Sequence, residues 1–239
     1  MRGYLTHGVS AGAIGGIAYG LFTAVVAGPL IEAVDHSGHD HGHHAAEAAA
    51  VAEPTASLVS VGGGLLWAIV LGGSFGLALF VLEPALPGGQ VRHYVLAGCG
   101  FLTVSAIPWL VSPPATPASE YLYGVDARLA IYAGLVGVGA AVAAAAVAGY
   151  RRTAPRHRLV GVATGLAPIV GAAVVLPAVT PTIVTHPGLS TDLVAAYQAT
   201  VVLGQAGSWL LIAATFGWLQ RRAGPSTLAG STEPTPESA

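Results

Sequence analysis

The chain has 239 residues, of which 54% are hydrophobic and only 8% are charged, and its mean hydropathy is +0.69. These values exclude an ordinary soluble domain and indicate an integral membrane protein. All nine basic residues are arginine, which excludes a P-loop lysine and every lysine-based catalyst. One cysteine and one methionine cannot form an intrachain disulfide, a thiolate metal site or a methionine-rich copper pathway. The net charge of −2, with basic residues beside apolar runs, excludes nucleic acid as a partner.

Six long apolar runs follow one another along the chain. A spanning helix needs about 20 apolar residues to cross a hydrocarbon core of ~30 Å. We therefore predict an all-α integral membrane protein in which residues 1–222 form a single membrane domain of about six transmembrane helices. The predicted spans are 8–31, 58–82, 94–111, 129–149, 159–179 and 195–219. The Ser, Thr, Pro and Glu composition of residues 223–239 predicts a disordered tail.

The first run leaves an alternative open, because Met-Arg followed by apolar and small residues is also typical of a cleavable signal sequence. The apolar part of a signal sequence is usually about 7–15 residues long, and this run is longer. A retained first span is therefore favoured. Cleavage would leave five spans with unchanged orientation.

The arginines predict the orientation of these spans. If successive spans alternate in direction, eight of the nine arginines fall on one side of the membrane, and only Arg128 lies opposite. The eight are Arg2, Arg92, Arg151, Arg152, Arg156, Arg158, Arg221 and Arg222. Since arginine concentrates in cytoplasmic loops, both termini are predicted to be cytoplasmic. Residues 32–57 and the loops that contain Glu120 and His186 are then external, where they can approach one outer mouth.

Small residues recur at four-residue spacing in the first two spans. The first has Gly8, Gly12, Gly16 and Gly20, and the second has Ser60, Gly64, Ala68, Gly72 and Gly76. Such stripes let helix backbones approach closely in lipid, so we expect flat packing faces, most naturally against each other. A general enrichment of the chain in Gly and Ala is the alternative explanation.

Prolines interrupt the third and fifth spans at Pro108, Pro168 and Pro177. Each proline frees a backbone carbonyl that a neighbour or a polar cavity must satisfy. The strongly polar side chains at depth are Thr103, Ser105, Gln198 and Gln205, and none of them is ionisable, which argues against a buried proton relay.

The segment after the first span carries the main chemical signal. Within the string DHSGHDHGHH lie five histidines and two aspartates, namely His36, His39, His41, His43, His44, Asp35 and Asp40. Neutral imidazole binds Co, Ni, Cu and Zn, and the carboxylates add oxygen donors and negative charge. The alternatives are a solvated spacer, or a tract that only protonates near pH ~6.5.

Spacing adds a sharper hypothesis for the start of this segment. Four side chains fall at i, i+3, i+4 and i+7, on one helical face, namely Glu32, Asp35, His36 and His39. Gly38 and Gly42 limit a helical extension of the first span, so the ordered site is expected to end near His39. The later histidines would then concentrate metal near the entrance.

Other polar residues are weaker candidates. His7, His93 and His157 lie beside arginines at the predicted cytoplasmic border, where interfacial placement explains them. Glu83 ends the second span at the same border and can stay hydrated. No constellation of His, Glu and Ser within a span suggests an enzyme.

In its order of motifs the chain resembles the CbtA family of proposed cobalt transporter subunits. The first span ends in GPLIEAVDH and runs into the His-rich segment, a Pro-rich loop joins the third and fourth spans, the fifth ends in LPAVTP, and the last ends in GWLQRR. Many relatives have a histidine where this chain has Ala178, which marks it as a divergent member. The resemblance implies cobalt transport linked to cobalamin metabolism, and a small single-span partner, CbtB. It also implies that His36, His39, His41, His43 and His44 form the family's His-rich segment.

We therefore predict a multi-pass cell-membrane protein, not an enzyme, that takes up a divalent transition metal captured by its external His-rich segment. Cobalt is the expected cargo, with nickel and zinc as alternatives, and no tightly bound cofactor is expected. The rival hypothesis is a non-transporting accessory or scaffold protein that binds metal for a partner. The lipid bilayer is an expected partner, as is the CbtB-like subunit, and a homo-oligomer is left open.

Overall fold

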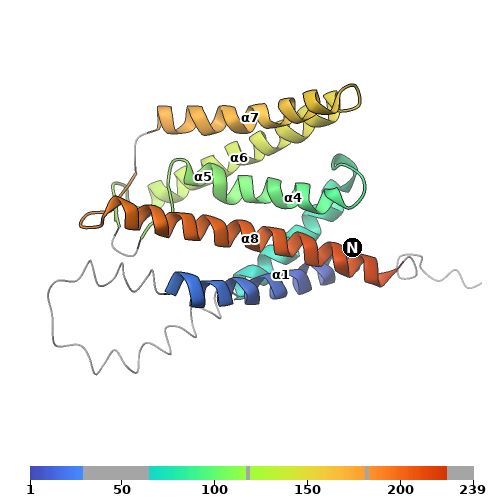
Figure 1. The fold of residues 1–239 in the computed structure, drawn as a ribbon, viewed down its shortest axis with the longest axis horizontal. Coiled ribbons are helices and arrows are strands. Elements are labelled where there is room, and N and C mark those ends of the chain that lie inside the picture. Colours follow the sequence, from blue (N-terminus) through green and yellow to red (C-terminus); the bar gives the residue numbers. More distant parts are fainter. Residues whose placement is uncertain (29–64, 117–118, 181–182, 225–239) are drawn as a thin grey trace, which may run out of the picture.

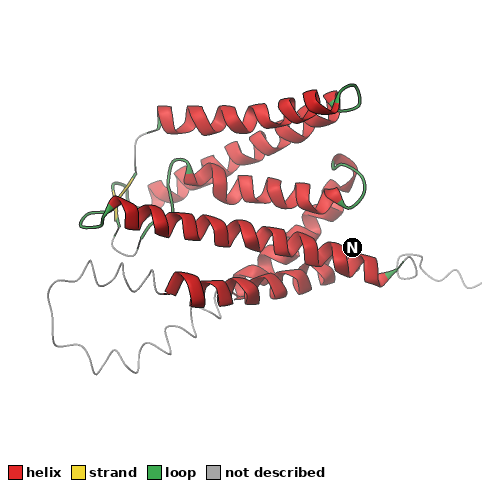
Figure 2. Ribbon diagram, viewed as in Figure 1, coloured by secondary structure: helices red, strands yellow, loops and turns green. Residues whose placement is uncertain are grey.

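The computed structural model describes residues 1–28, 65–116, 119–180 and 183–224, and nearly all of these residues are helical. The long helices run side by side, and a short two-stranded antiparallel sheet lies at one end of the bundle (Figure 1, Figure 2). The first helix is α1 (Arg2–Phe22), which continues as the π-helix η1 (Thr23–Ala27), and the second described helix is Leu65–Ala85. A third helical segment consists of α4 (Val91–Phe101), the π-helix η3 (Leu102–Ala106) and α5 (Ile107–Trp109). Three long helices follow, namely α6 (Val125–Thr153), α7 (Arg158–Val179) and α8 (Thr191–Ala223). The last turn of the helix Leu65–Ala85 is the 3-10 segment η2 (Glu83–Ala85).

Four helices in the described part of the chain are long and apolar enough to cross a membrane, namely Leu65–Ala85, α6, α7 and α8. Their outer surfaces are apolar, as lipid contact requires; Leu159 and Val174, for example, are largely exposed. The chain is thus an all-helical, multi-pass membrane protein. The predicted span 8–31 overlaps α1 and η1, and the predicted span 94–111 overlaps α4, η3 and α5. α1 is rich in glycine, and the π-helix η3 interrupts the other segment.

Several helices extend beyond the predicted spans. The predicted spans 129–149 and 159–179 leave residues 150–158 as their connection. In the structure α6 continues through Arg151 and Arg152 to Thr153, so the connection consists only of residues 154–157. Alanine favours the helix, and arginines in its last turn complement the negative end of the helix dipole. α8 begins at Thr191, because Ser190 Oγ accepts the Leu193 N–H at 3.3 Å and caps the helix.

The two small-residue stripes pack against each other, as the sequence predicts. A Cβ atom on Gly12 would collide with the Ala68 carbonyl, and one on Gly16 would lie 2.7 Å from the Ala68 Cβ. Gly8 and Gly72 lie in the same backbone-to-backbone contact. Ser60 and Gly64 of the second stripe lie outside the described residues, so the contact is described only from Gly8 to Gly16.

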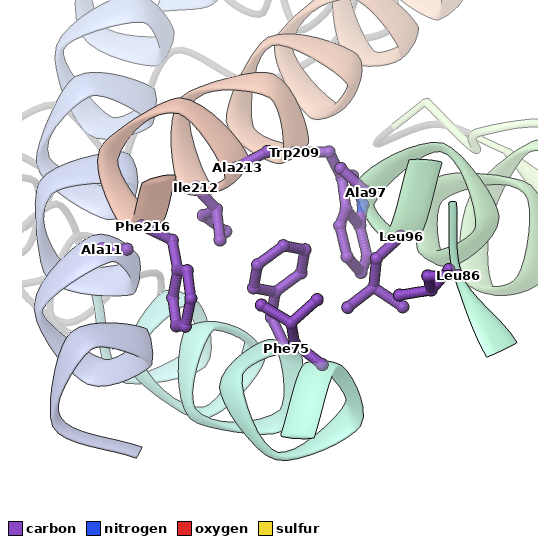
Figure 3. Packing of buried hydrophobic residues seen from close by; sticks show 10 residues of the cluster. Ala11, Phe75, Leu86, Leu96, Ala97, Trp209, Ile212, Ala213 and Phe216 are labelled. Atoms are coloured by element: carbon purple, nitrogen blue, oxygen red, sulfur yellow. The ribbon is translucent and has the colours of Figure 1, made fainter. Parts of the chain in front are cut away.

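The main hydrophobic core lies between α8, the helix Leu65–Ala85 and α4 (Figure 3). Phe216 of α8 is fully buried and stacks edge-on with Phe75, with ring centroids 5.6 Å apart. Trp209 packs over Gly100 of α4, where no larger residue would fit. Trp209 thus holds the middle of α8 against the end of α4, and Phe216 holds the end of α8 against the helix Leu65–Ala85.

The second half of the bundle is the α6–α7 hairpin. The hydroxyls of Thr153 and Thr164 lie 2.6 Å apart and join the two helices. Pro168 has no N–H for the Thr164 carbonyl four residues earlier, and this carbonyl lies against Gly149, where a Cβ atom would approach it to 2.8 Å. The absent side chain at position 149 therefore lets α6 cover the carbonyl that the proline frees.

The short two-stranded sheet joins two loops at the opposite end of the bundle from most arginines. Strand β1 (Glu120–Tyr121) pairs antiparallel with β2 (Val184–Thr185), which sets Glu120 across from Thr185, next to His186. The Arg128 guanidinium lies 3.8 Å from the centre of the Tyr121 ring. The loops expected to meet at one outer mouth therefore do come together.

Candidate functional site at the arginine-bearing end

The predicted metal-site residues all lie outside the described residues. They are Glu32, Asp35, His36, His39, Asp40, His41, His43 and His44, and their assignment stays a prediction. Within the described ranges, no three His, Cys, Asp or Glu side chains are placed to hold a metal ion together. A preformed multidentate metal centre is thus absent from this part of the chain.

At the opposite end of the bundle from the two-stranded sheet, four helix ends enclose a cavity of about 480 Å³, which we call the polar pocket. The start of α1, the end of Leu65–Ala85, the start of α4 and the end of α8 meet there, where Figure 1 places the N-terminus. Its polar side chains are Tyr4, His7, Glu83, Gln90, Arg92, His93, Gln220 and Arg221. The helices alternate in direction, so polar residues that end one span meet polar residues that begin another.

Glu83 links three of these helix ends. Its carboxylate accepts a hydrogen bond from the Tyr4 hydroxyl at 2.8 Å and forms an ion pair with Arg92. Burial, together with the neighbouring Glu83 carboxylate, raises the pKa of Tyr4, which lies outside the predicted span 8–31. Tyr4 therefore remains a neutral donor to the carboxylate.

His93 is the most buried polar residue of the pocket, with only 3% of its surface exposed. Its Nε2 lies 2.9 Å from Oε1 of Gln220. An amide oxygen can only accept, so Nε2 carries the proton and Nδ1 of the neutral ring keeps its lone pair. Nδ1 is buried and has no hydrogen-bond partner among the described residues.

The charge state of His93 follows from its surroundings. Burial lowers the pKa of this imidazole, and the nearby Arg92 and Arg221 guanidinium groups lower it further, against the opposing effect of the Gln220 hydrogen bond. His93 precedes the span predicted from Tyr94, so it lies at the membrane border. The ring is neutral near pH ~7, the form in which histidine binds metals.

Two residues of α8 shape the space around His93. A Cβ atom on Gly217 would lie 3.1 Å from Nδ1 of His93, so the glycine lets α8 pack closely against the buried ring. The Phe216 ring lies 5.6 Å from the His93 ring and 6.1 Å from the His7 ring, centroid to centroid. The two imidazoles thus flank one buried aromatic ring.

A second cavity, of about 560 Å³, lies between α4 and the α6–α7 hairpin. Its lining is mainly apolar, with Val91, Val95 and Leu102 on one side and Val147 and Ile169 on the other. Its described lining offers no set of charged or ligating groups.

The sequence did not predict the polar pocket. His7, His93 and Glu83 were each explained by interfacial placement, which overlooked that the structure brings them into one cavity. One sequence signal could have indicated the pocket: polar residues recur where four predicted spans reach the same side of the membrane. Combining them requires knowing which spans are neighbours, and that information is tertiary.

Comparison with known proteins identifies the chain. The model of the CbtA family, described as a probable cobalt transporter subunit, matches residues 1–221. Neither the curated proteins nor the solved structures contain a match. The family match covers essentially the whole chain and agrees with its helical, multi-pass architecture. This chain belongs to the CbtA family of probable cobalt transporter subunits.

Proposed function

We propose that this protein moves cobalt into the cell and captures the ion outside through its His-rich segment. The observation that carries the proposal is the family match over residues 1–221. The arginine distribution supports the direction, because it predicts an external His-rich segment and a cytoplasmic polar pocket.

Capture would occur in two stages. The run of His41, His43 and His44 would raise the local concentration of the ion, as a tethered ligand does. The face formed by Glu32, Asp35, His36 and His39 then supplies mixed oxygen and nitrogen donors. Such donors suit a six-coordinate dication that keeps some of its water and is therefore released easily.

The family description as a subunit implies a second component. We propose that this partner is a small single-span membrane protein of the CbtB type. The competing function is a non-transporting accessory protein that binds Co, Ni or Zn for another subunit. Cobalt accumulation in cells that contain this protein, with and without the single-span partner, separates the two functions.

The decisive experiment measures initial cobalt uptake in cells with and without the gene. Replacing His41, His43 and His44 by alanine is expected to raise the cobalt concentration for half-maximal uptake and to leave the maximal rate nearly unchanged. Loss of the maximal rate would place the tract in the permeation path. Equal uptake in cells with and without the gene, in the presence of the partner, would refute transport.

A further inference from the structure

We propose that the second cavity, between α4 and the α6–α7 hairpin, binds one acyl chain of an anionic phospholipid whose phosphate pairs with arginines at the end of α6. The proposal goes beyond transport, because it assigns a ligand to a surface that the transport function leaves unused, and it holds whichever metal the protein moves. The shape of the cavity, its lining, its length and the charge at its mouth support it.

The cavity exists because α6 diverges from α4. Within the predicted span 94–111, α6 lies directly against η3, where a Cβ atom on Gly139 would come within 2.8 Å of the Thr103 Cα. Toward the arginine-bearing end the two helices separate and make little contact with each other (Figure 1). Gly98 lines the resulting wedge, and the described structure has nothing within 4 Å of a Cβ atom built there. The space beside α4 is therefore open.

The lining of the wedge suits hydrocarbon. Its α4 side consists mainly of Val91, Val95, Gly98 and Leu102, and no charged side chain lines the described cavity. Val91 and Gly98 are exposed, so the wedge opens toward the membrane. An empty space would deprive these side chains of dispersion contacts, and acyl chains are the material that a bilayer supplies at this depth.

The length of the wedge matches one leaflet. Its lining on α4 runs from Val91 to Leu102, which corresponds to about 16 Å of helix at about 1.5 Å per residue. One leaflet contributes about half of a ~30 Å hydrocarbon core. A spanning helix, about 30 Å long and about 10–12 Å across, has a volume several times that of the 560 Å³ cavity. A single acyl chain therefore fits the wedge better than a partner helix.

Arg151 places positive charge at the mouth of the wedge. Its Nη1 donates to the Ala85 carbonyl at 2.7 Å, which ties the end of α6 to the turn whose Pro87 and Gly88 line the cavity. The preceding residue, Tyr150, lines the cavity itself. A guanidinium has five N–H donors, so most of those on Arg151 remain available to a phosphate.

The arginines that follow strengthen this charge. Arg152, Arg156 and Arg158 are exposed, and neither they nor Arg151 form an ion pair with a described carboxylate. Glu83, which precedes the turn at the mouth, is already paired with Arg92. Unpaired basic residues beside a pocket between spanning helices are typical of sites for anionic lipid headgroups on the cytoplasmic side. The arginine count predicts that this side is cytoplasmic.

The first test measures lipid selectivity. The full-length protein in detergent is titrated with dioleoyl phosphatidylglycerol or with the neutral dioleoyl phosphatidylcholine, and native mass spectrometry reports bound lipid. The anionic lipid should bind more tightly, and Arg151→Gln should weaken its binding about fivefold while leaving phosphatidylcholine unchanged. Arg222→Gln, on the same membrane side but on α8, is the control and should change neither. Equal affinity for the two lipids, or an equal loss of both in Arg151→Gln, would overturn the proposal.

The second test locates the lipid through the single cysteine of the chain, since Cys99 lines the cavity. Dioleoyl phosphatidylglycerol should slow alkylation of Cys99 by N-ethylmaleimide severalfold, whereas dihexanoyl phosphatidylglycerol, with the same headgroup and short chains, should not. Gly98→Phe should fill the wedge and weaken lipid binding severalfold. Gly171→Phe also enters open space in the described structure, but on α7 outside the cavity, and should bind lipid normally.

Three results of the second test would overturn the proposal. Unchanged alkylation at saturating dioleoyl phosphatidylglycerol would place the lipid elsewhere, and so would unchanged binding in Gly98→Phe. Protection of Cys99 by a co-purified single-span partner, and not by lipid, would assign the wedge to a partner helix. Each of these results is independent of cobalt uptake, so the lipid site and the proposed function fail separately.

Discussion

Tyr132 illustrates how one side chain repairs a defect in a spanning segment. Pro108 has no N–H to donate to the Val104 carbonyl four residues earlier. The Tyr132 hydroxyl of α6 donates to that carbonyl instead, at 2.9 Å. The sequence predicted that proline would free a carbonyl requiring a partner, but the identity of the partner depends on the contact between α6 and η3.

Tyr132→Phe should therefore destabilise the protein by about 1 kcal/mol, because it leaves a carbonyl unpaired in a region without water. In a Pro108→Ala background, where residue 108 again has an N–H, the same change should cost less. Unfolding in mixed detergent micelles measures both values in a double-mutant cycle. The control is Tyr123→Phe, at an exposed tyrosine. An equal cost of Tyr132→Phe in both backgrounds would contradict the pairing.

Glu32 is the residue at which the outer site is expected to begin. It lies closest to the hydrocarbon boundary, where a carboxylate is costly to desolvate unless a cation compensates it. Glu32→Gln keeps the shape and removes the charge, so it should lower cobalt uptake severalfold at every cobalt concentration. Glu47→Gln and Glu53→Gln, later in the same segment, should have smaller effects. Equal and small effects of all three would show that only the general negative charge of the segment matters.

At the scale of elements, the contact between α1 and the helix Leu65–Ala85 was readable from the sequence, because its spacing follows from helix geometry. Gly8, Gly12 and Gly16 lie on one face and meet the backbone of the other helix. The π-helices η1 and η3 were not predicted. A π-turn depends on which neighbours satisfy the shifted backbone groups, and these neighbours lie elsewhere in the chain.

The glycine contact gives a prediction with an internal control. Gly12→Val should separate α1 from the helix Leu65–Ala85 and lower stability by more than about 2 kcal/mol, because the new side chain meets backbone that cannot move aside. Gly137→Val, in the middle of α6, enters open space in the described structure and carries the same change in helix propensity. Thermal unfolding in detergent compares the two. A similar loss for both would mean that propensity, and not packing, determines the cost.

At the scale of the molecule, the helices and their alternation were largely predictable, because a bilayer demands long apolar runs. α7, at Arg158–Val179, nearly coincides with the predicted span 159–179. The polar pocket was not predictable, since Tyr4, Glu83, His93 and Gln220 become neighbours only when α1, Leu65–Ala85, α4 and α8 are placed side by side. The sequence identified the residues that sit at the membrane border, and the packing determined which of them share a cavity.

The orientation of the whole bundle is the property on which the proposed direction of transport depends. The described arginines other than Arg128 lie at the helix ends on one side, with Arg2 beginning α1, Arg151 near the end of α6 and Arg221 near the end of α8. The difference of eight arginines to one predicts that this side is cytoplasmic. A reporter fused after Arg222 should therefore read cytoplasmic, and one inserted near Ala49 should read external. Arginine substitutions test whether these charges set the orientation. Removing Arg151, Arg152, Arg156 and Arg158 together should reduce the fraction of protein with a cytoplasmic C-terminus, whereas Arg128→Gln should increase it. The reverse reading from the two reporters would place the His-rich segment inside the cell, where it suits export or storage, and would refute uptake.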